Sequence, residues 1–327
     1  MDESHTIRSQ SNVVFRKDYA IDQAELHKLY ENAKRDQWNA TKDIPWSTPV
    51  DAERGVIADE LVDAFATDYW RKLSTKQQGE LNRRIAAWRL STLMYGEHGA
   101  MLVCSQLVEM VAGGDAKFFQ ATQVVDEARH TEVLNRYITE KLDGLRYPMP
   151  HAEQELFDML IGDSRWPVKT IGLQLVAETF AVSLFRMLGE TSKDGLLREI
   201  CRRILADESR HMGFGMLSLP GVVAGSSEAE RRELEEVTEW ALVKTLKGMF
   251  PYEPYRDMGF SEAEIEDIRR LKRERQAGGE AVLFRQVFKK ELDSSLLQNL
   301  ARIGLLNERS GERLNALGIR ASGTPAS

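Results

Sequence analysis

The sequence predicts an all-α fold, and two observations support that prediction. Apolar residues recur at helical spacing through most of the 327 residues, whereas alternation between hairpin turns, which is typical of β-strands, is almost absent. The periodic stretches are separated by residues that end helices, at Gly113-Gly114, at 146–150 (RYPMP), at Trp166-Pro167 and at 219–227 (LPGVVAGSS). We therefore expect long helices joined by short connections.

The helical pattern begins at AELHKLYENAK, and the expected helix 51–72 follows a start signal with Thr48 as N-cap and Pro49 as the first helical residue. The charged stretch IEDIRRLKRERQAGGE predicts a helix with a solvated face near the C-terminal end. In order, the remaining expected helices are 76–112, 115–142, 152–162, 167–192, 194–217, 226–248, 261–277 and 280–306.

The domain organisation expected from these elements is simple. Residues 1–20 are polar and predict a flexible N-terminal arm, and residues 21–327 predict a single helical domain. Within that domain, the core bundle covers about 76–217 and the C-terminal helices cover about 226–306. The C-terminal helices would pack on the bundle or on a partner subunit.

Composition and charge exclude several classes of function. The formal net charge of −7 speaks against a general affinity for nucleic acid. The longest apolar runs are far short of a membrane span, and the stretch MDESHTIRSQ lacks the apolar segment of an export signal. Cys104 and Cys201 are far apart in apolar surroundings and form no CxxC pair, which indicates reduced core residues. We expect a cytoplasmic protein that binds neither nucleic acid nor membranes.

The motif Asp-Glu-x-Arg-His occurs twice. In the first copy, Glu127 and His130 are three residues apart and therefore share one face of a helix. Glu208 and His211 have the same relation in the second copy. Apolar residues flank both pairs at helical spacing, so both pairs face a core, where an ionised carboxylate must be paired or bind a metal.

Two further acids interrupt apolar helical stripes. Glu97 lies in RLSTLMYGEHGAMLVCSQL, and Glu178 lies in TIGLQLVAETFAVSLF. Glu127 follows Glu97 by 30 residues, and Glu208 follows Glu178 by the same interval. The chain thus repeats one unit, a helix with Glu and then a helix with Glu-x-x-His, and two such hairpins make a four-helix bundle. Bundles with this ligand set hold two iron or two manganese ions, so the six side chains predict a dinuclear metal site.

This set of residues resembles the ferritin-like superfamily, and within it the non-haem di-iron oxygenases and the ribonucleotide reductase small subunit. The resemblance covers roughly residues 76–217 and implies a ferritin-like four-helix bundle with additional flanking helices. The flanking stretch DQWNATKDIPW also resembles di-iron oxygenase-like sequences, though only loosely.

The resemblance gives the aspartate of each motif a supporting role beside the metals. It implies that Asp126 accepts a hydrogen bond from His211 across the bundle. Asp207 would accept one from His130 in the same way, and each bond would fix the tautomer and raise the basicity of the ligand. The arginines of the two motifs would neutralise these aspartates, and they are Arg129 and Arg210.

Residues that flank the ligands are candidates for lining a substrate cavity, and they are Met94, Met101, Leu134, Ala181, Phe185 and Met212. Gln123 and Gln174 each precede a ligand glutamate by one turn and are placed to hydrogen-bond it. The ribonucleotide reductase small subunit has a tyrosine one turn after its first ligand histidine. That position is Leu134 here, so Tyr137, one turn further on, is the candidate redox residue.

Oxygen and imidazole ligands suit two iron ions (Fe2+/Fe3+), with manganese as the alternative. From the resemblance we expect an oxygenase that uses O2 as co-substrate and acts on a small organic molecule by C-hydroxylation or N-oxygenation. Some N-oxygenases of this type carry a third histidine where this sequence has Ile204. A desaturase or ligand oxidase, a radical-generating subunit and an iron-storage protein use the same cluster and remain alternatives.

The expected partners follow from the electron demand of such an oxygenase. The sequence has no flavin or nicotinamide fingerprint and no iron–sulfur cysteines. Electrons would therefore come from an external reductase or ferredoxin. We also expect the chain to form a homodimer.

Overall fold

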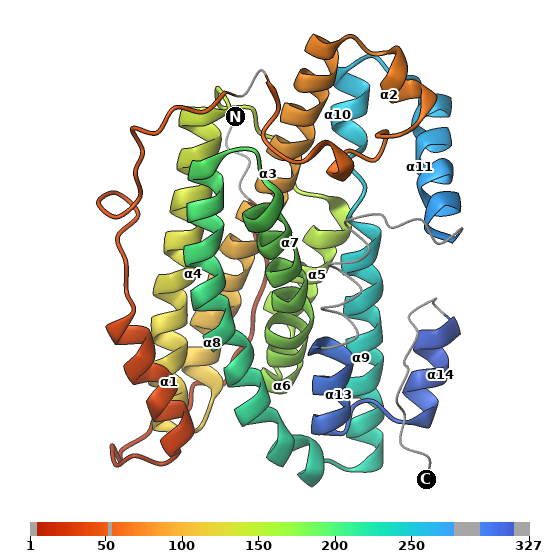
Figure 1. The fold of residues 1–327 in the computed structure, drawn as a ribbon. Coiled ribbons are helices and arrows are strands. Elements are labelled where there is room, and N and C mark those ends of the chain that lie inside the picture. The colour runs from red at the N-terminus through yellow and green to blue at the C-terminus, as the bar shows by residue number, and fades with distance from the viewer. Residues whose placement is uncertain (1–4, 52–53, 278–294, 317–327) are drawn as a thin grey trace.

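The computed structural model describes residues 5–51, 54–277 and 295–316. Within these residues the secondary structure is helical and contains no strand, so the predicted all-α class is confirmed (Figure 1). The long central helices run side by side, and the shorter helices pack around them.

The central bundle is built from two helical hairpins (Figure 1). The first hairpin consists of α3 (Thr75–Met110) and α4 (Gly114–Lys141). The second hairpin pairs α8 (Gly195–Gly225) with a composite rod. That rod is made of α6 (Trp166–Thr170), the π-helical segment η3 (Ile171–Ala177) and α7 (Glu178–Thr191). Each hairpin corresponds to one of the two repeated units in the sequence.

Local capping explains where two of these rods begin. At the start of α3, the side chain of Ser74 accepts a hydrogen bond from Gln77 N, and the Gln77 side chain accepts one from Ser74 N at 2.9 Å. At the start of α8, the Asp194 carboxylate accepts hydrogen bonds from the backbone N–H groups of Leu196 and Leu197 at 3.1 and 2.9 Å. These caps satisfy backbone donors that a helix leaves free at its first turn.

The helix α5 (His151–Gly162) crosses the bundle at very short range because glycines face it. A Cβ atom at Gly99 would overlap the ring of Phe157, and one at Gly172 would overlap the side chain of Leu160. Glycine therefore allows α5 to lie against both α3 and η3. This contact positions the face of α5 that later forms part of a cavity.

The expected helix 51–72 is wrong for most of its length. The described part of this stretch contains only the short 3-10 turn Asp59–Leu61 (η2) and α2 (Asp68–Lys72), and no helix begins at Thr48. The Asn82 side chain accepts hydrogen bonds from the backbone of Val56 and Ile57 at 2.8 and 3.1 Å. Hydrogen bonds to a side chain thus replace the backbone hydrogen bonds of a helix in this segment. Its buried apolar residues happen to recur at helical spacing, which is why the sequence predicted a helix.

The expected break at 219–227 is confined to Ser226 and Ser227, because α8 continues through Pro220 to Gly225 and α9 begins at Glu228. Leu219 and Val223 are buried in the same hydrophobic cluster as residues of the C-terminal helices. Tertiary packing therefore outweighs the local cost of the proline.

The C-terminal helices pack on the bundle as expected (Figure 1). The predicted helix 280–306 lies partly outside the described residues, and its described part forms one short helix that ends at Ile303. Another short helix follows where none was predicted. In order, these helices are α9 (Glu228–Lys247), α10 (Tyr252–Asp257), α11 (Glu262–Ala277), α13 (Leu297–Ile303) and α14 (Glu308–Ala316).

The N-terminal segment leads into α1 (Ala24–Arg35), which packs against α4 and α8. Residues 5–20 are non-helical and mostly exposed, and they touch the bundle at several points. The backbone N–H of Val14 donates to the carbonyl of Glu109 at 2.9 Å, and the Ser11 hydroxyl donates to the Glu109 carboxylate at 2.8 Å. The flexibility of this arm stays a prediction.

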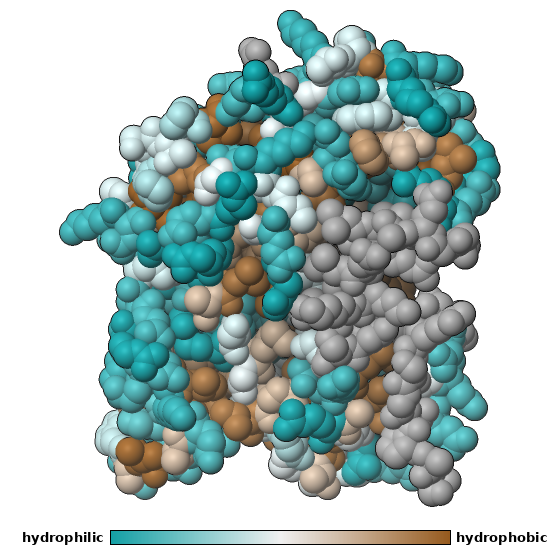
Figure 2. Space-filling model, viewed as in Figure 1, coloured by the Kyte–Doolittle hydropathy of each residue, from teal (hydrophilic) through white to brown (hydrophobic). Residues whose placement is uncertain are grey.

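One helical stretch is more apolar than the sequence analysis allowed. Trp166–Thr191 spans 26 residues and, by length and composition alone, could cross a membrane. In the structure, 78% of its most apolar window is buried inside the protein, which is the pattern of a core helix. The face shown in Figure 2 is mostly hydrophilic, with hydrophobic residues scattered among the polar ones.

Candidate metal centre

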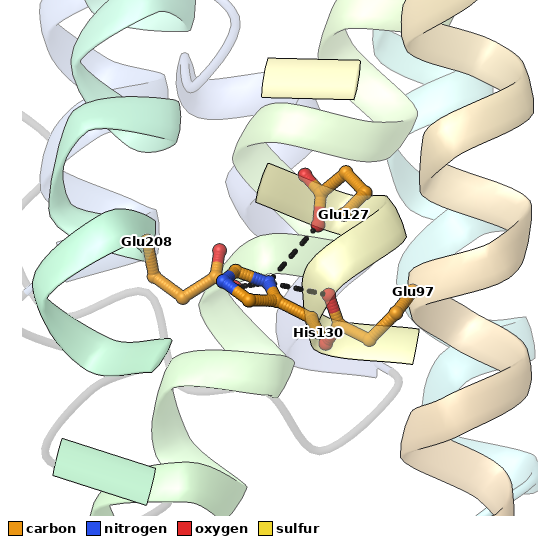
Figure 3. A group of neighbouring side chains, drawn as sticks. All are labelled: Glu97, Glu127, His130 and Glu208. Atoms are coloured by element: carbon orange, nitrogen blue, oxygen red, sulfur yellow. Dashed lines mark hydrogen bonds and ion pairs between the residues drawn. The ribbon is translucent and has the colours of Figure 1, made fainter. Parts of the chain in front are cut away.

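The structure brings the six predicted ligands together in the middle of the bundle. Ligand atoms of Glu97, Glu127, His130 and Glu208 lie within 4.8 Å of one another (Figure 3). Atoms of Glu127, Glu178 and His211 form a second group with the same property. Glu127 belongs to both groups, and none of the six residues is more than 4% exposed. Two adjacent groups that share a carboxylate would suit two neighbouring metal ions.

Both histidines turn Nδ1 toward the carboxylates. The Nδ1 atom of His211 lies 3.0 Å from Glu208 Oε2 and 3.2 Å from Glu127 Oε1. The Nδ1 atom of His130 lies 3.1, 3.3 and 3.2 Å from an oxygen of Glu97, Glu127 and Glu208, respectively (Figure 3). The two histidines thus occupy equivalent positions in the two repeated units.

Without cations, this enclosure has to be neutralised by protons. Burial, reinforced by the charge of Glu208, raises the pKa of both Glu97 and Glu178 well above the usual value. Burial disfavours the charged form of His130, but hydrogen bonds to Asp207 and to the surrounding glutamates raise its pKa well above the usual value. Metal ions binding here would replace those protons.

The donor atoms fit metal ions. Glu127 Oε2 and Glu208 Oε1 are buried, and their contacts to His130 Nδ1 at 3.3 and 3.2 Å do not have hydrogen-bond geometry, so neither atom has a well-formed hydrogen bond among the described residues. Buried polar atoms of this kind are rare in native proteins and call for an explanation, such as a bound ion. Carboxylate oxygen and imidazole nitrogen are donors that suit iron and manganese. The cluster therefore fits a two-metal centre, and the role of each ligand stays a prediction.

The far nitrogen of each histidine faces an aspartate across the bundle. Nε2 of His130 lies 3.0 Å from Asp207 Oδ2. Nε2 of His211 lies 3.3 Å from Asp126 Oδ2. These are the two pairings expected from the sequence. Because an ionised carboxylate only accepts hydrogen bonds, each Nε2 carries a proton, which leaves Nδ1 of each ring as the atom that would bind a metal.

The two arginines bridge the two aspartates. Arg129 Nη2 lies 2.5 Å from Asp126 Oδ1 and 3.0 Å from Asp207 Oδ2. Arg210 Nη2 lies 2.5 Å from Asp207 Oδ1 and 3.5 Å from Asp126 Oδ2. Opposite charges therefore alternate around a closed, nearly buried group of four side chains. The arrangement agrees with the neutralising role expected from the sequence, which remains untested.

Two residues that the sequence analysis did not single out complete this network. Trp38 Nε1 donates to Asp207 Oδ2 at 2.8 Å, and Gln37 Nε2 donates to Asp126 Oδ1 at 3.0 Å. The Trp38 ring also stacks on the imidazole of His130, with the ring centroids 6.5 Å apart. Both residues lie in the stretch DQWNATKDIPW just after α1, and its loose family resemblance was the sole signal for them.

A chain of glutamines supports the other side of the cluster, beside the π-helical segment η3 that ends directly before Glu178. Gln123 Nε2 donates to Glu127 Oε1 at 2.9 Å and to Glu178 Oε1 at 3.1 Å. Gln174, within η3, donates to Gln123 Oε1 at 2.8 Å. Gln123 thus holds a ligand candidate as expected, whereas Gln174 bonds to Gln123 and not to Glu178. π-Helical turns often occur at functional sites.

A mostly apolar cavity of about 100 Å³ lies beside the cluster, between α3, α5, the η3–α7 rod and α9. Glu97 and Glu178 form part of its wall, and Trp88, Phe157 and Phe180 supply aromatic surface. An engineered apolar cavity of roughly 150 Å³ is enough to hold benzene. At about two-thirds of that volume, this cavity is of the right order of size for a small organic ligand, and its walls would have to move apart to hold a ring.

The structure corrects the predicted cavity lining, because among the six candidates only Ala181 lines this cavity. Met94, Leu134 and Phe185 pack in the hydrophobic core, and Met101 and Met212 are not part of the cavity wall. The predicted residues were chosen because they lie one or two turns before or after a ligand on the same helix face. The cavity instead opens sideways toward α5 and α9, which no pattern around the ligands indicates.

Tyr137 is fully buried and has a structural partner. Its hydroxyl donates to Asp194 Oδ2 at 2.6 Å, so it joins α4 to the N-cap of α8. Burial, together with the charge of Asp194, raises the pKa of Tyr137 far above the usual value. A redox role for this tyrosine stays a prediction.

Fold and site together define a helical bundle built around a carboxylate–histidine cluster suited to two metals. Residues 21–287 match the family P-aminobenzoate N-oxygenase AurF, and the chain belongs to this family. No curated protein sequence matches the chain.

Solved structures share the fold. The chain is similar to dimanganese(II)-NrdF of Streptococcus sanguinis, with 17% identity, coverage of 89% of this chain and 93% of that chain, and a TM-score of 0.54. It is also similar to an R2-like ligand-binding oxidase with an aerobically reconstituted metal cofactor, with 17% identity, coverage of 90% and 100%, and a TM-score of 0.52. The ferritin-like, ribonucleotide reductase small subunit-like fold predicted from the sequence is therefore confirmed.

Proposed function

We propose that this protein is an O2-activating dimetal oxygenase that acts on a small, one-ring organic substrate. The observation that carries the proposal is the apolar cavity whose wall includes Glu97 and Glu178, two members of the cluster. A storage protein needs no such cavity for an organic molecule, whereas an oxygenase must hold its substrate beside the metals. Membership of an N-oxygenase family makes one-ring arylamines the first substrates to test.

The proposed cofactor is a pair of iron ions, with manganese as an alternative in either position. The residues that would hold it are Glu97, Glu127, His130, Glu178, Glu208 and His211. When bound, two Fe2+ ions would supply the two electrons that, with two protons, reduce one oxygen atom of O2 to water while the other atom enters the substrate.

The side chains of this protein contribute orientation and water exclusion. Asp126 and Asp207 would hold the ring proton on Nε2 and so leave Nδ1 of each histidine for the metal, and Gln123 would fix the carboxylates of Glu127 and Glu178. The apolar wall would keep bulk water from the reacting centre and so protect reactive species from side reactions.

Each further turnover requires two new electrons. Cys104 and Cys201 are both free and buried, and neither offers an iron–sulfur site. The proposal therefore includes an external reductase or ferredoxin as electron donor. A homodimer located in the cytoplasm remains part of the proposal.

A single-turnover experiment with labelled dioxygen tests the function. Iron-loaded protein, chemically reduced without oxygen, is mixed with 18O2 and para-substituted anilines. We expect one labelled atom in the product, and multiple turnovers only when a reductant is added. Label found solely in water, with hydrogen lost from the substrate, would support an oxidase or desaturase. Catalytic consumption of Fe2+ with formation of a mineral would support iron storage. Glu127→Ala serves as the inactive control.

A further inference from the structure

The cavity wall contains one acid that does not belong to the cluster. Glu153, on α5, lines the cavity together with aromatic and aliphatic side chains. Its Oε2 atom is buried and has no hydrogen-bond partner within the described part of the chain. Burial raises the pKa of this carboxyl group well above the usual value, and no neighbouring charge offsets that effect. A buried polar atom without a partner is unusual in a native protein, so its presence in an apolar wall calls for a functional explanation.

The position of Glu153 is fixed by the close contact between α5 and α3. A Cβ atom at Gly96 would lie 3.1 Å from Glu153 Oε1, so the carboxyl group rests directly on the backbone next to Glu97. One turn further along α5, Phe157 fills the space that the absent side chain of Gly99 leaves. The contact fixes Glu153 against the helix that carries Glu97, and both residues line the same cavity.

The cations that line the cavity are engaged with other groups. Lys244 Nζ lies 2.6 Å from Glu155 Oε2, on a different face of α5 from Glu153. Arg89 Nη2 donates to the backbone carbonyl of Leu61 at 3.0 Å. Neither contact involves Glu153, so the carboxyl group is available to a ligand.

We propose that Glu153 selects the substrate by pairing with a basic, hydrogen-bond-donating nitrogen at the end of the ligand that points away from the metals. The ring of the ligand would fill the apolar part of the cavity, and the opposite end would face Glu97 and Glu178. This inference deepens the proposed function and rests on it for the assumption that the cavity receives the substrate. It assigns to this chain a substrate class distinct from aminobenzoates.

The physical reason for the selection is the cost of buried charge. An ammonium group would give the Glu153 carboxylate the partner that it lacks, and a hydrogen bond between charged groups is among the stronger ones in proteins. A benzoate would bring its own negative charge into this apolar wall, where Glu153 offers it no cation, which is costly. Discrimination between the two ligands would thus come from attraction on one side and repulsion on the other.

Binding of two matched ligands tests this inference without any turnover. 4-(Aminomethyl)aniline and 4-aminobenzoate have the same ring and aniline nitrogen but opposite charges at the other end. Titration calorimetry on the oxygen-free, Fe2+-loaded protein should show binding of the aminomethyl compound at least about tenfold tighter. Glu153→Gln should reduce this ratio at least about tenfold. Asp158→Asn, an acid on the same helix that contacts His5, should leave the ratio unchanged.

Equal or tighter binding of 4-aminobenzoate by the wild-type protein would overturn the inference, and so would an unchanged ratio in Glu153→Gln. A failure of oxygen insertion with a preserved amine preference would instead count against the proposed function alone. A second variant separates recognition from a structural role. Glu153→Met should raise the thermal midpoint of the ligand-free protein by about 1–4 °C, because an unpartnered buried carboxyl group destabilises the fold. A lower midpoint would show that Glu153 supports the fold and would contradict the proposal.

Discussion

The two sides of the metal cluster differ in how their polar groups are satisfied. Behind the histidines, Asp126 and Asp207 each contact an imidazole and both arginines, and each accepts one more hydrogen bond from the segment after α1. On the opposite side, the wall is apolar, and the Oε2 atom of Glu153 has no partner among the described residues. On the network side every oxygen of the two aspartates is engaged, and Nε of Arg129 and Arg210 alone lacks a partner among the described residues, whereas on the cavity side the unpartnered atom belongs to a carboxylate.

This difference separates two tasks within one bundle. A buried polar network in which each aspartate has several partners is rigid, because displacing any member leaves others unpaired. The network side therefore suits the task of holding ligands in a fixed geometry. A cavity with one unpaired acid costs stability, and proteins retain such features mainly where function requires them. Changes on the network side should alter metal binding, and changes on the cavity side should alter ligand binding.

The largest expected effect comes from removing two carboxylates of the cluster, one of them the shared Glu127. Wild-type protein should hold roughly two iron ions per chain, and Glu127→Ala combined with Glu208→Ala should hold fewer than one. Glu132→Ala, an exposed acid on the same helix, is the control and should retain full loading. Metal analysis after iron loading under nitrogen measures both. Saturation of the wild-type protein at one ion, or full loading of the double variant, would contradict the two-metal assignment.

Loss of one aspartate from the network should have the next largest effect. Asp207→Ala leaves the Nε2 proton of His130 without its acceptor and should lower metal affinity about 10–100-fold while the fold is retained. Circular dichroism checks the fold, and a chelator competition assay measures the affinity. Asp207→Asn keeps an acceptor and should lose less affinity than Asp207→Ala. Direct coordination of a metal by Asp207 in a metal-bound structure would refute its supporting role.

The sequence predicts those features of the two sides that follow from residue spacing within one helix or one hairpin. Glu97, Glu127 and His130 follow from helical spacing, because one buried acid in an apolar stripe already requires a partner. The repeat interval then pairs the two hairpins, which is why the bundle and its six converging side chains were predictable. The pairing of Asp207 with His130 came from family resemblance and not from spacing.

The cavity side was not predictable, because it depends on how α5 and α9 pack against the bundle. Nothing in the sequence around Glu153 distinguishes it from the neighbouring acids Glu155 and Asp158 on the same short helix. Its role appears only when Gly96 brings α5 against α3. The prediction of a helix over 51–72 was wrong for a related reason. The side chain of Asn82, on a different helix, binds the backbone of this segment and replaces helical hydrogen bonds.

Trp38 offers a finer test of the network side. Trp38→Phe keeps an aromatic ring beside His130 but removes the Nε1 donor to Asp207. Because Asp207 retains its other partners, metal affinity should fall only about threefold to tenfold. Trp46→Phe is the matched control, since Trp46 Nε1 donates to the carbonyl of Ala40 at 2.6 Å and not to the network. An equal loss of affinity in both variants would mean that the effect reflects general destabilisation.

The smallest effect is expected where α1 is anchored, because this anchor reaches the network only through the segment that carries Trp38. Asp115 accepts hydrogen bonds from the backbone N–H groups of Asp22 and Gln23 at 2.8 and 2.9 Å, and its Oδ1 lies 2.9 Å from His27 Nδ1.

Burial opposes ionisation of Asp115, but these hydrogen bonds lower its pKa to about 2. A carboxyl group whose pKa is lower in the folded state stabilises the protein above its unfolded pKa and loses that contribution as the pH falls. The free energy of unfolding should therefore decline between about pH 4 and about pH 2. In Asp115→Asn this decline should be shallower, while Asp18→Asn in the exposed arm should behave like the wild type. Urea titrations across this range measure the slope, and metal loading at neutral pH should be the same in all three proteins. An equally steep decline in Asp115→Asn would show that other acids account for the acid sensitivity and that this anchor contributes little.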